Sequence, residues 1–390
     1  MRVLCVFGTR PEAIKMAPVI RELKRYPEYF EVRICVTAQH REMLDQVLNI
    51  FNIQPDIDLN LMEPDQALSE LTSRVITTMT RVLEQERPDW VLIQGDTTTV
   101  MATALAAFYL RIPVGHVEAG LRTRDRYNPF PEEINRRLVG VLATYHFAPT
   151  QTAKEALLAE GVPSDSIVVT GNTVVDALYW ILGQPPSERS RQIFDELGLL
   201  GNKDCKIILV TAHRRESFGQ RFESLCRGLR RLVERNPDVY LIYPVHMNPN
   251  VRGPVYRILT GHERIRLIEP LPYETFVRLM DVAYIVLTDS GGIQEEAPVL
   301  GKPVLVLREK TERPEVIDAG VAKLVGTDEE RIVDEAERLL YDAGAYEAMA
   351  KAGSLFGDGR AAERIVQTLL GIAEGDKNKI TINRRSDGRI

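Results

Sequence analysis

The chain has 390 residues, of which 44% are hydrophobic and 27% charged, and its formal net charge is -6. This composition is ordinary for a soluble globular protein, and at about 100 to 200 residues per domain the length predicts two domains with sizeable cores. The acidic balance argues against a surface for nucleic acid or for an anionic membrane, although it still permits a local pocket for an anion.

The four cysteines are scattered along the chain, with neither a CxxC motif nor a metal-ligand spacing: Cys5, Cys35, Cys205 and Cys226. We interpret them as buried thiols in a reducing compartment and expect no metal site. The apolar run in the opening segment MRVLCVFGTR is too short for the core of a signal peptide or for a membrane span. The sequence therefore predicts a cytoplasmic protein.

The first half alternates short apolar runs with helical patterns, which is typical of βαβ units and a parallel sheet. The strand-like runs are residues 2–7, 31–36, 90–96, 113–119 and 145–149, and the helical patterns begin near Ala13 and then cover residues 41–51, 66–85, 98–110 and 132–143. These elements predict an α/β domain with a doubly wound, Rossmann-like sheet over residues 1–176.

Residues 183–204 interrupt the alternation with Pro-Pro, serines and charges and indicate a linker region. The alternation of strand-like runs and helical patterns then resumes. The strand-like runs are residues 206–213, 239–246, 265–270, 284–290 and 303–308. The helical patterns cover residues 221–235, 255–259, 274–281 and 292–301. We expect a second Rossmann-like domain over residues 177–359, a final helix 360–373 that packs back on the first domain, and a mobile tail 374–390. Two such domains place their strand ends at a shared cleft, where ligands usually bind.

The stretch TDSGGIQEEAP leaves an apolar strand through Ser290, Gly291 and Gly292 and enters a helix. The glycines let a ligand approach the main chain, and the first N–H groups of the helix favour a phosphate. The alternative is that Ser290 only caps the helix and the glycines only form the turn, with Glu295 and Glu296 as solvated helix residues.

The segment FGTRPEAIK ends a strand with a glycine turn and starts a helix at Pro11. Arg10 at the turn and Lys15 on the helix predict a second grip on phosphate, unless both are ordinary solvated cations. The segment lacks the GxxxxGK[ST] pattern of a Walker loop.

Carboxylates follow two neighbouring strands of the first domain. Asp96 ends one strand and Glu118 the next, where burial makes acid–base work possible, although Asp96 is also placed to cap the following helix. Glu132 begins a later helix and Arg136 lies one turn on. The helix dipole alone would account for Glu132, whereas a loop rich in proline and aromatic residues before it suits a lid over a sugar.

In the second domain, His213 ends the first strand and is followed by Arg214, while His246 ends the next strand. A histidine at a strand end is more often structural, but this one opens towards cations and is placed to bind a diphosphate or move a proton. Arg313 lies in a loop after a strand, as a surface residue or as a third cation on the phosphates. Spacing alone favours a core position for Phe276.

Taken together, these segments resemble the non-hydrolysing UDP-N-acetylglucosamine 2-epimerases of bacteria over about residues 1–373. The matching strings are FGTRPEAIKMAP, TAQHREMLDQVL, GDTTT, GHVEAGLR, PFPEEINRR, GNTVVDAL, TAHRRE, TDSGGIQEEAP and ERPE. The resemblance implies the two-domain glycosyltransferase-B fold and the interconversion of UDP-N-acetylglucosamine and UDP-N-acetylmannosamine, supplying the manno sugar for cell-surface polysaccharides.

The resemblance also assigns roles to positions. It implies that Asp96, Glu118 and Glu132 are catalytic carboxylates and that His213 acts at the diphosphate. The implied contacts to UDP and sugar are Arg10, Lys15, Arg136, Phe276, Ser290, Gly291, Gly292, Glu296 and Arg313. Glu296 would accept the ribose hydroxyls. Some relatives bind a second UDP-N-acetylglucosamine as an activator, which makes Gln39 and Arg214 candidates for an effector site.

The implied reaction eliminates UDP to a glycal and adds it back after C2 is protonated from the other face, so it requires two carboxyl groups at C2. No NAD and no metal are expected: the first strand is not followed by GxGxxG, and no tyrosine precedes a lysine by four positions. A homodimer is expected from the family. Three rivals remain at this stage, namely a retaining glycosyltransferase of the same architecture, a nucleotide-sugar sensor and a hydrolysing epimerase.

Overall fold

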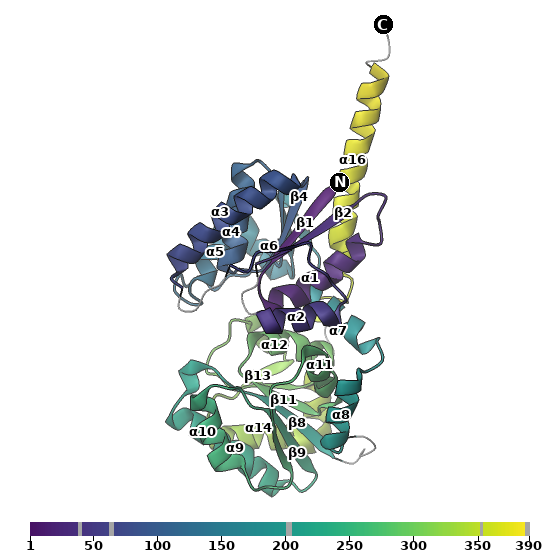
Figure 1. The fold of residues 1–390 in the computed structure, drawn as a ribbon. Coiled ribbons are helices and arrows are strands. Elements are labelled where there is room, and N and C mark those ends of the chain that lie inside the picture. The colour runs from purple at the N-terminus through teal and green to yellow at the C-terminus, as the bar shows by residue number, and fades with distance from the viewer. Residues whose placement is uncertain (38–40, 62–65, 200–204, 352–353, 387–390) are drawn as a thin grey trace. The chain divides into compact units, whose positions relative to one another are not determined.

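The computed structural model describes residues 1–37, 41–61, 66–199, 205–351 and 354–386 (Figure 1). Contacts divide the chain into two compact units, unit 1 formed by Met1–Tyr179 with Gly357–Ile390 and unit 2 by Trp180–Phe356. The chain therefore leaves unit 1 within helix α7 (Thr173–Leu182) and returns after the short turn η3 (Ser354–Phe356).

The described strands of unit 1 form one parallel sheet in the order β3-β2-β1-β4-β5-β6-β7. They are β1 (Arg2–Phe7), β2 (Glu31–Val36), β3 (Ile57–Asp58), β4 (Trp90–Gln94), β5 (Val114–Val117), β6 (Tyr145–Ala148) and β7 (Ile167–Val169). Since β1 pairs with β2 on one side and with β4 on the other, the winding direction reverses between β1 and β4. Ligands of open α/β sheets bind at such a switch point, beyond the carboxyl ends of the strands.

Helices connect these strands: α1 (Arg10–Leu23), α2 (Arg41–Ile50), α3 (Leu68–Glu86), α4 (Thr98–Tyr109), α5 (Glu132–Leu142), α6 (Gln151–Ala159) and α7, with the turn η1 (Ser164–Ser166). α3, α4 and α5 pack side by side, as Figure 1 shows. The middle helix, α4, has fully buried alanines, including Ala102, Ala104 and Ala106, whose small side chains let its neighbours approach closely.

The last helix, α16 (Ala361–Ser386), packs against α1 (Figure 1). Its first N–H groups, those of Ala361 and Ala362, donate to the carboxylate of Asp176 at 3.2 and 2.9 Å, which satisfies donors that a helix start leaves open. The predicted helix ended at residue 373, and this end is wrong because the helix continues to Ser386. Residues 387–390 of the predicted mobile tail lie outside the described residues.

The described strands of unit 2 repeat the same topology in the order β10-β9-β8-β11-β12-β13. They are β8 (Lys206–Thr211), β9 (Val239–Pro244), β10 (Ile265–Ile268), β11 (Ile285–Thr288), β12 (Val304–Val306) and β13 (Ala322–Leu324). The helical elements are α8 (Glu188–Glu196), η2 (Arg215–Ser217), α9 (Gln220–Arg235), α10 (Pro249–Leu259), α11 (Tyr273–Val282), α12 (Gly291–Val299), α13 (Pro314–Asp318), α14 (Glu329–Tyr341) and α15 (Ala343–Met349). The switch point of this sheet lies between β8 and β11.

Helix α8 lies within the segment predicted to be a linker, so that part of the prediction is wrong. Ser187 caps the helix by accepting from the N–H of Ser190 at 3.1 Å, and its own N–H donates to Glu274 of α11 at 3.0 Å. Ser190 is buried and its hydroxyl contacts that of Thr275 at 2.8 Å. These contacts with α11 stabilise a short helix whose own sequence is largely polar.

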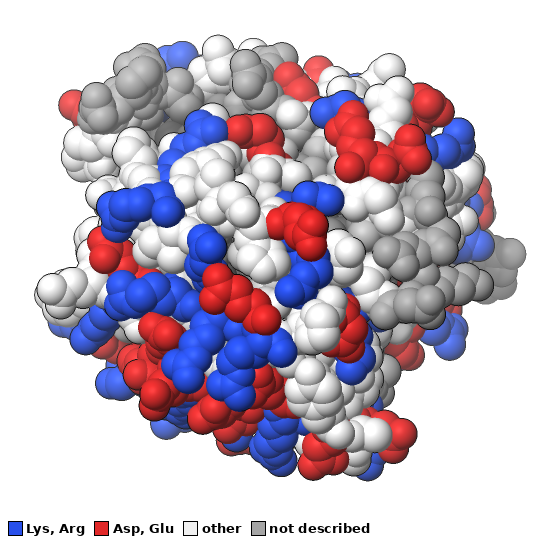
Figure 2. Space-filling view, turned by 90° about the horizontal axis from the view of Figure 1, so that it is seen from below, with Lys and Arg blue, Asp and Glu red and all other residues white. Residues whose placement is uncertain are grey.

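Charges of both signs are interspersed over the face of the molecule in Figure 2. In unit 2, Arg227 and Arg231 of α9 both pair with Glu329 of α14, at 3.3 and 3.5 Å. Such exposed pairs contribute little to stability. The mixture of signs leaves the face in Figure 2 without the single-sign field that attracts polyanions. Among the described residues, no helix is both long and apolar enough to cross a membrane.

Three of the cysteines are buried, as predicted, whereas Cys205 is only half-buried, which corrects the prediction for that residue. Burial raises the pKa of the thiols of Cys5, Cys35 and Cys226 to about 12. These thiols are therefore core side chains with little thiolate character.

Two buried histidines lie opposite one another in the sheet of unit 1, His116 on β5 and His146 on β6. Burial lowers the pKa of His116 to about 3 and that of His146 to about 4. His116 Nε2 lies 2.7 Å from the carbonyl oxygen of Gly95, the residue before Asp96. Both imidazoles are therefore neutral in the folded protein at pH 7.

We expect the free energy of unfolding of unit 1 to decrease as the pH falls below about 6.5. Below this pH the histidines of the unfolded chain are protonated, whereas the buried imidazoles of the folded protein stay neutral. Each histidine contributes a slope of at most about 1.4 kcal/mol per pH unit. His116→Gln keeps a donor for Gly95 but cannot titrate. Urea unfolding at about pH 7.5 and about pH 5, followed by Trp90 fluorescence in a Trp180→Phe background, should show the variant losing up to about 2 kcal/mol less than its parent. Equal losses would contradict this account.

Candidate active site

The turn between β1 and α1 carries Arg10. Thr9 is the N-cap of α1, and Glu12 returns to the N–H of Thr9, so the two residues form a capping box. Gly8 is required here by a close approach, since a Cβ at this position would lie 2.1 Å from the hydroxyl of Thr37. Arg10 is the first residue of α1 and is half-buried, and its side chain makes no hydrogen bond or ion pair within the described residues.

Glu12 joins this turn to the turn after β4. Its carboxylate, only 3% exposed, accepts from the N–H groups of Gly8 and Thr9 at 2.7 and 2.8 Å and from the hydroxyl of Thr97 at 2.6 Å. Thr97 is in turn the N-cap of α4. One buried carboxylate therefore fixes both loops at the switch point of unit 1.

Asp96 lies in the second of these loops and does not cap α4, because Thr97 has that role. Its carboxylate instead accepts from two nitrogens of Arg136, at 2.8 and 2.7 Å, and its carbonyl oxygen accepts from the amide of Asn135 at 2.9 Å. Two neighbouring residues of α5 thus hold both the side chain and the main chain of Asp96. The capping interpretation of Asp96 is excluded.

Glu118 follows β5 in a left-handed backbone conformation, with φ of 63°. This conformation is uncommon for a residue with a side chain and often marks a functional position. Its carboxylate pairs with Lys15 of α1 and accepts from the amide of Gln94 at 3.0 Å. Lys15 is therefore an immediate neighbour of Glu118 and is no ordinary solvated cation.

The two adjacent glutamates at the start of α5 have different surroundings. Glu133 is fully buried and accepts from the N–H groups of Thr123 and Arg124 at 2.9 and 3.1 Å, so it holds the preceding loop. Glu132 is half-buried and makes no hydrogen bond or ion pair within the described residues. Its carboxyl group is therefore available to a ligand.

In unit 2, the exit of β8 is held by Asp289, which follows β11. Asp289 accepts from the N–H groups of His213 and Arg214 at 2.6 and 2.7 Å. The imidazole of His213 stacks on that of His246, with centroids 5.1 Å apart. Burial lowers the pKa of His213, although the charge of Asp289 opposes the shift.

The first residues of α12 are Gly291 and Gly292, whose N–H groups have no carbonyl acceptor four residues earlier in the helix. Ser290 occupies the N-cap position, but its hydroxyl accepts no hydrogen bond from the first turn of the helix. The alternative that Ser290 only caps the helix is therefore not supported. A Cβ at Gly291 would lie 2.7 Å from Oε1 of Glu312. The helix start thus offers main-chain donors beside the carboxylate of Glu312, which would have to move to make room for a larger residue at position 291.

Glu295 and Glu296 are both buried, which overturns the alternative that they are solvated. Glu295 pairs with the buried guanidinium of Arg313, while Glu296 accepts from the hydroxyl of Tyr273 at 3.4 Å. Phe276 is 8% exposed on α11, as its spacing suggested. Arg313 is thus no surface residue, and its positive charge is balanced within unit 2.

Comparison with known proteins identifies the family of the chain. Residues 21–370 match the family model described as UDP-N-acetylglucosamine 2-epimerase. The UDP-N-acetylglucosamine 2-epimerase of Salmonella typhimurium is 56% identical over 371 residues, which are 95% of this chain and 98% of the relative.

The chain belongs to the UDP-N-acetylglucosamine 2-epimerase family.

Solved structures agree with this membership. The UDP-GlcNAc 2-epimerase from Neisseria meningitidis, crystallised with UDP-GlcNAc, superposes with a TM-score of 0.88 at 50% identity and covers 95% of this chain and 100% of its own. The enzyme from Methanocaldococcus jannaschii, in complex with UDP-GlcNAc and UDP, gives 0.78 at 35% identity, with 95% and 99% covered. The α/β fold with two Rossmann-like sheets, expected from the glycosyltransferase-B resemblance, is confirmed.

The structure brings most of the predicted residues of this family member together in two groups. In unit 1, Arg136 contacts Asp96 and Lys15 contacts Glu118, all beyond β4 and β5 or on helices that pack there. In unit 2, His213 and Arg214 join the start of α12 through Asp289. Gln39 lies outside the described residues.

Sequence reasoning missed the side chains that hold these groups in place. They are Glu12, Gln94 and Glu133 in unit 1 and Asp289 and Glu312 in unit 2. The Thr-x-x-Glu spacing of Thr9 and Glu12 is a capping-box signal that would have indicated one of them. Glu133 contacts residues nine and ten positions earlier, and the contacts of the other three residues span 24 or more positions. No local pattern indicates them.

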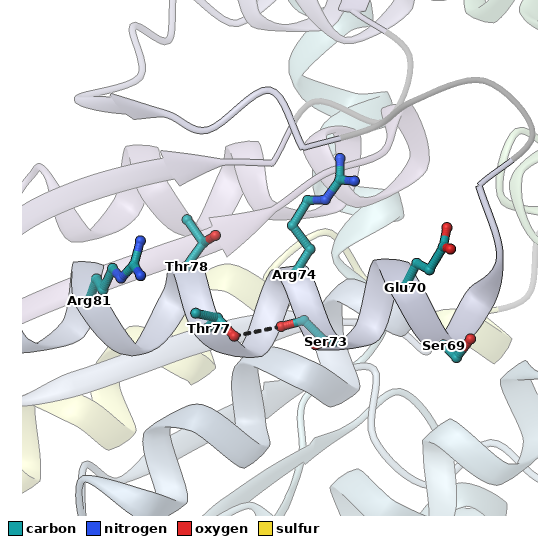
Figure 3. Close-up of a pocket in the computed structure, with 7 residues that line it drawn as sticks. All are labelled: Ser69, Glu70, Ser73, Arg74, Thr77, Thr78 and Arg81. Atoms are coloured by element: carbon teal, nitrogen blue, oxygen red, sulfur yellow. Dashed lines mark hydrogen bonds between the residues drawn. The ribbon is translucent and has the colours of Figure 1, made fainter.

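A shallow groove of about 590 Å³ runs along α3 and is lined by Ser69, Glu70, Ser73, Arg74, Thr77, Thr78 and Arg81 (Figure 3). Thr77 donates to the carbonyl of Ser73 at 2.9 Å and so satisfies its own hydroxyl. None of the predicted site residues lies in this groove. Among the described residues, no cluster of three histidine, cysteine or acidic side chains has the geometry of a metal site.

Removal of the Glu12 carboxylate should destabilise unit 1. Glu12→Ala leaves two N–H groups and one hydroxyl without acceptors in a buried place, which costs about 2 to 4 kcal/mol. Glu12→Gln retains an acceptor oxygen and should lose less. Urea unfolding of both variants in the Trp180→Phe background, followed by Trp90 fluorescence, measures the difference. Equal stability of wild type and Glu12→Ala would show that these bonds do not hold the loops.

Proposed function

We propose that the protein interconverts UDP-N-acetylglucosamine and UDP-N-acetylmannosamine by reversible inversion at C2 of the sugar. The observation that carries the proposal is family membership over nearly the whole chain, including 50% identity to a Neisseria meningitidis enzyme crystallised with UDP-GlcNAc. The acidic side chains of unit 1 and the anion-binding features of unit 2 supply the chemistry that this reaction needs.

Unit 2 supplies the grip on UDP in this proposal. The N–H groups of Gly291 and Gly292 and the hydroxyl of Ser290 bind the phosphates, where the helix start favours negative charge. The buried carboxylate of Glu296 accepts the ribose hydroxyls, and Phe276 packs beside the nucleoside. Arg313 of the same unit, and Arg10 and Lys15 of unit 1, are the further contacts to UDP in this proposal.

Asp96, Glu118 and Glu132 act on the sugar. The C2–H bond breaks towards a carboxylate while the C1–O bond breaks towards UDP, which leaves a glycal with its double bond between C1 and C2. A carboxylic acid then protonates C2 from the opposite face, and UDP adds back at C1. The proton that enters on one face balances the one that leaves on the other, so the overall reaction is an isomerisation.

The three carboxyl groups differ in whether a cation is paired with them. Asp96 is held by Arg136 and Glu118 by Lys15, so each carboxylate has a cation that compensates its charge. Glu132 makes no hydrogen bond or ion pair within the described residues. In this proposal Arg136 orients the carboxylate of Asp96 towards the sugar, in addition to the direct contact with substrate that the family resemblance implies.

The chemistry requires no external oxidant, because the bonding electrons of C2–H form the glycal double bond while UDP takes the C1–O pair. We therefore propose that neither NAD nor a metal takes part. The charge on departing UDP is stabilised instead by the start of α12 and by four side chains, those of His213, Arg10, Lys15 and Arg313. We further propose a cytoplasmic homodimer, with Arg214 and Gln39 as effector contacts for a second UDP-N-acetylglucosamine.

Exchange of the C2 proton with solvent tests the reaction itself. Protein incubated with UDP-N-acetylglucosamine in D₂O should replace the C2 proton by deuterium and accumulate the manno sugar nucleotide, both of which NMR detects. A glycosyltransferase or a sensor would leave the spectrum unchanged, and a hydrolysing epimerase would release UDP and free N-acetylmannosamine. Either result would reject the proposal.

The carboxylate roles are tested by amide substitution. Asp96→Asn and Glu118→Gln should reduce turnover at least about 1,000-fold and leave the affinity for UDP within about tenfold, because they change the chemistry more than the binding. Glu155→Gln, at an exposed position of α6, is the matched control and should keep full activity. Active amide variants would remove these residues from the mechanism.

A further inference from the structure

Asp289 is a buried carboxylate to which the sequence pattern assigned no role. It follows β11 directly and is 1% exposed. Its Oδ2 accepts from the N–H groups of both His213 and Arg214, at 2.6 and 2.7 Å. A single oxygen of Asp289 thus ties the exit of β8 to the exit of β11, across the switch point of unit 2.

The second oxygen of Asp289 faces the imidazole of His213. Oδ1 lies 3.4 Å from Nδ1 of His213, and it is buried without a hydrogen bond to any described residue. A buried carboxylate oxygen without a donor is costly, so a proton on Nδ1 of His213 is the natural donor for it. The carboxylate therefore favours the tautomer that carries its proton on Nδ1.

The ring of His213 is fixed in orientation by a second contact. It stacks on His246 with ring planes inclined by only 13°, and its side chain is 39% exposed. With Nδ1 turned towards Asp289, Nε2 lies on the opposite edge of the ring. Nε2 is thus the nitrogen left to meet a ligand.

The charges around His213 set the response to an anion. Burial lowers the pKa of His213, Asp289 acts in the opposite sense, and His246 and Arg214 lower it further. The positive charge of Arg214 is partly met by Glu312, at 3.2 Å. Neutral imidazole is favoured without ligand, and a dianionic diphosphate would shift the balance towards imidazolium.

We propose that Asp289 is a positioning residue that holds Nδ1–H of His213, so that Nε2 takes up a proton from solvent when the diphosphate of UDP binds and then donates a hydrogen bond to it. The proton returns to solvent when UDP is released, and no covalent bond forms. This inference rests on the proposed function, which places the diphosphate at His213. A histidine oriented by a carboxylate behind it is a general device for fixing the tautomer and raising the basicity of the outer nitrogen.

Asp289→Asn separates the two roles of the carboxylate. The amide oxygen still accepts hydrogen bonds from the N–H groups of His213 and Arg214, whereas the amide nitrogen cannot accept a hydrogen bond from Nδ1–H of His213. Calorimetry of UDP binding at about pH 7, in two buffers of different ionisation enthalpy, measures proton uptake. The wild type should take up more protons than Asp289→Asn, by up to one, and should bind UDP about tenfold more tightly.

His213→Gln should give the same loss as Asp289→Asn, and the double variant should add nothing, because both changes remove one proton site. Asp281→Asn, at an exposed carboxylate of α11, is the matched control and should behave as wild type. Ionisation of UDP itself is common to all variants and cancels. Equal proton uptake by wild type and Asp289→Asn would overturn the inference.

A measurement without ligand or variant separates this inference from the proposed function. NMR of ¹⁵N-labelled wild-type protein should find neutral His213 protonated on Nδ1. The Nε2–H tautomer would overturn the role of Asp289 even if UDP binds and turnover is normal. Conversely, absence of UDP binding by a protein with the Nδ1–H tautomer would reject the diphosphate site while leaving the Asp289–His213 contact standing.

Discussion

A buried carboxylate in each unit ties the loop after the first strand of the sheet to the loop after the strand beside it. In unit 1 Glu12 accepts from Gly8, Thr9 and Thr97, and in unit 2 Asp289 accepts from His213 and Arg214. Parallel strands bring these loops to the same edge of the sheet, but they leave the main-chain N–H groups there without partners. The carboxylate satisfies those groups and fixes the loops, and the residues proposed to act on substrate depend on that fixed frame.

Charge compensation follows the same logic around the site. Asp96, Glu118 and Glu295 each pair with a cation, and each cation comes from a different segment of the chain. Pairing reduces the cost of keeping so many ionic groups half-buried, although it does not by itself add much stability. Its value lies in orientation, because a carboxylate held by a guanidinium presents a defined face to a ligand.

The alternating pattern of apolar runs and helical segments was enough to predict two parallel α/β sheets, since buried parallel strands read as continuous apolar runs. The pattern failed where an element has little hydrophobic signal of its own. The two-residue strand β3 and the polar helix α8 exist through contacts with neighbours, as Ser190 shows by its buried hydroxyl against Thr275. The end of α16 was misplaced because the helix continues to Ser386 through a polar segment that contains glycine and asparagine and gives no helical signal of its own.

The sequence by itself determined the sheet topology class, the strand ends proposed to carry chemistry and, through its long specific motifs, the family. These features are local, because strand ends, glycine turns and helix starts are determined by residues that lie close together in the sequence. Only the tertiary structure decided which cation meets which carboxylate, that Thr97 and not Asp96 caps α4, and that Asp289 stands behind His213. The pair of Asp96 with Arg136 and the contact of Asp289 with His213 join residues 40 or more positions apart. The geometry of these contacts is set by how the strands order themselves in the sheet, which no local pattern records.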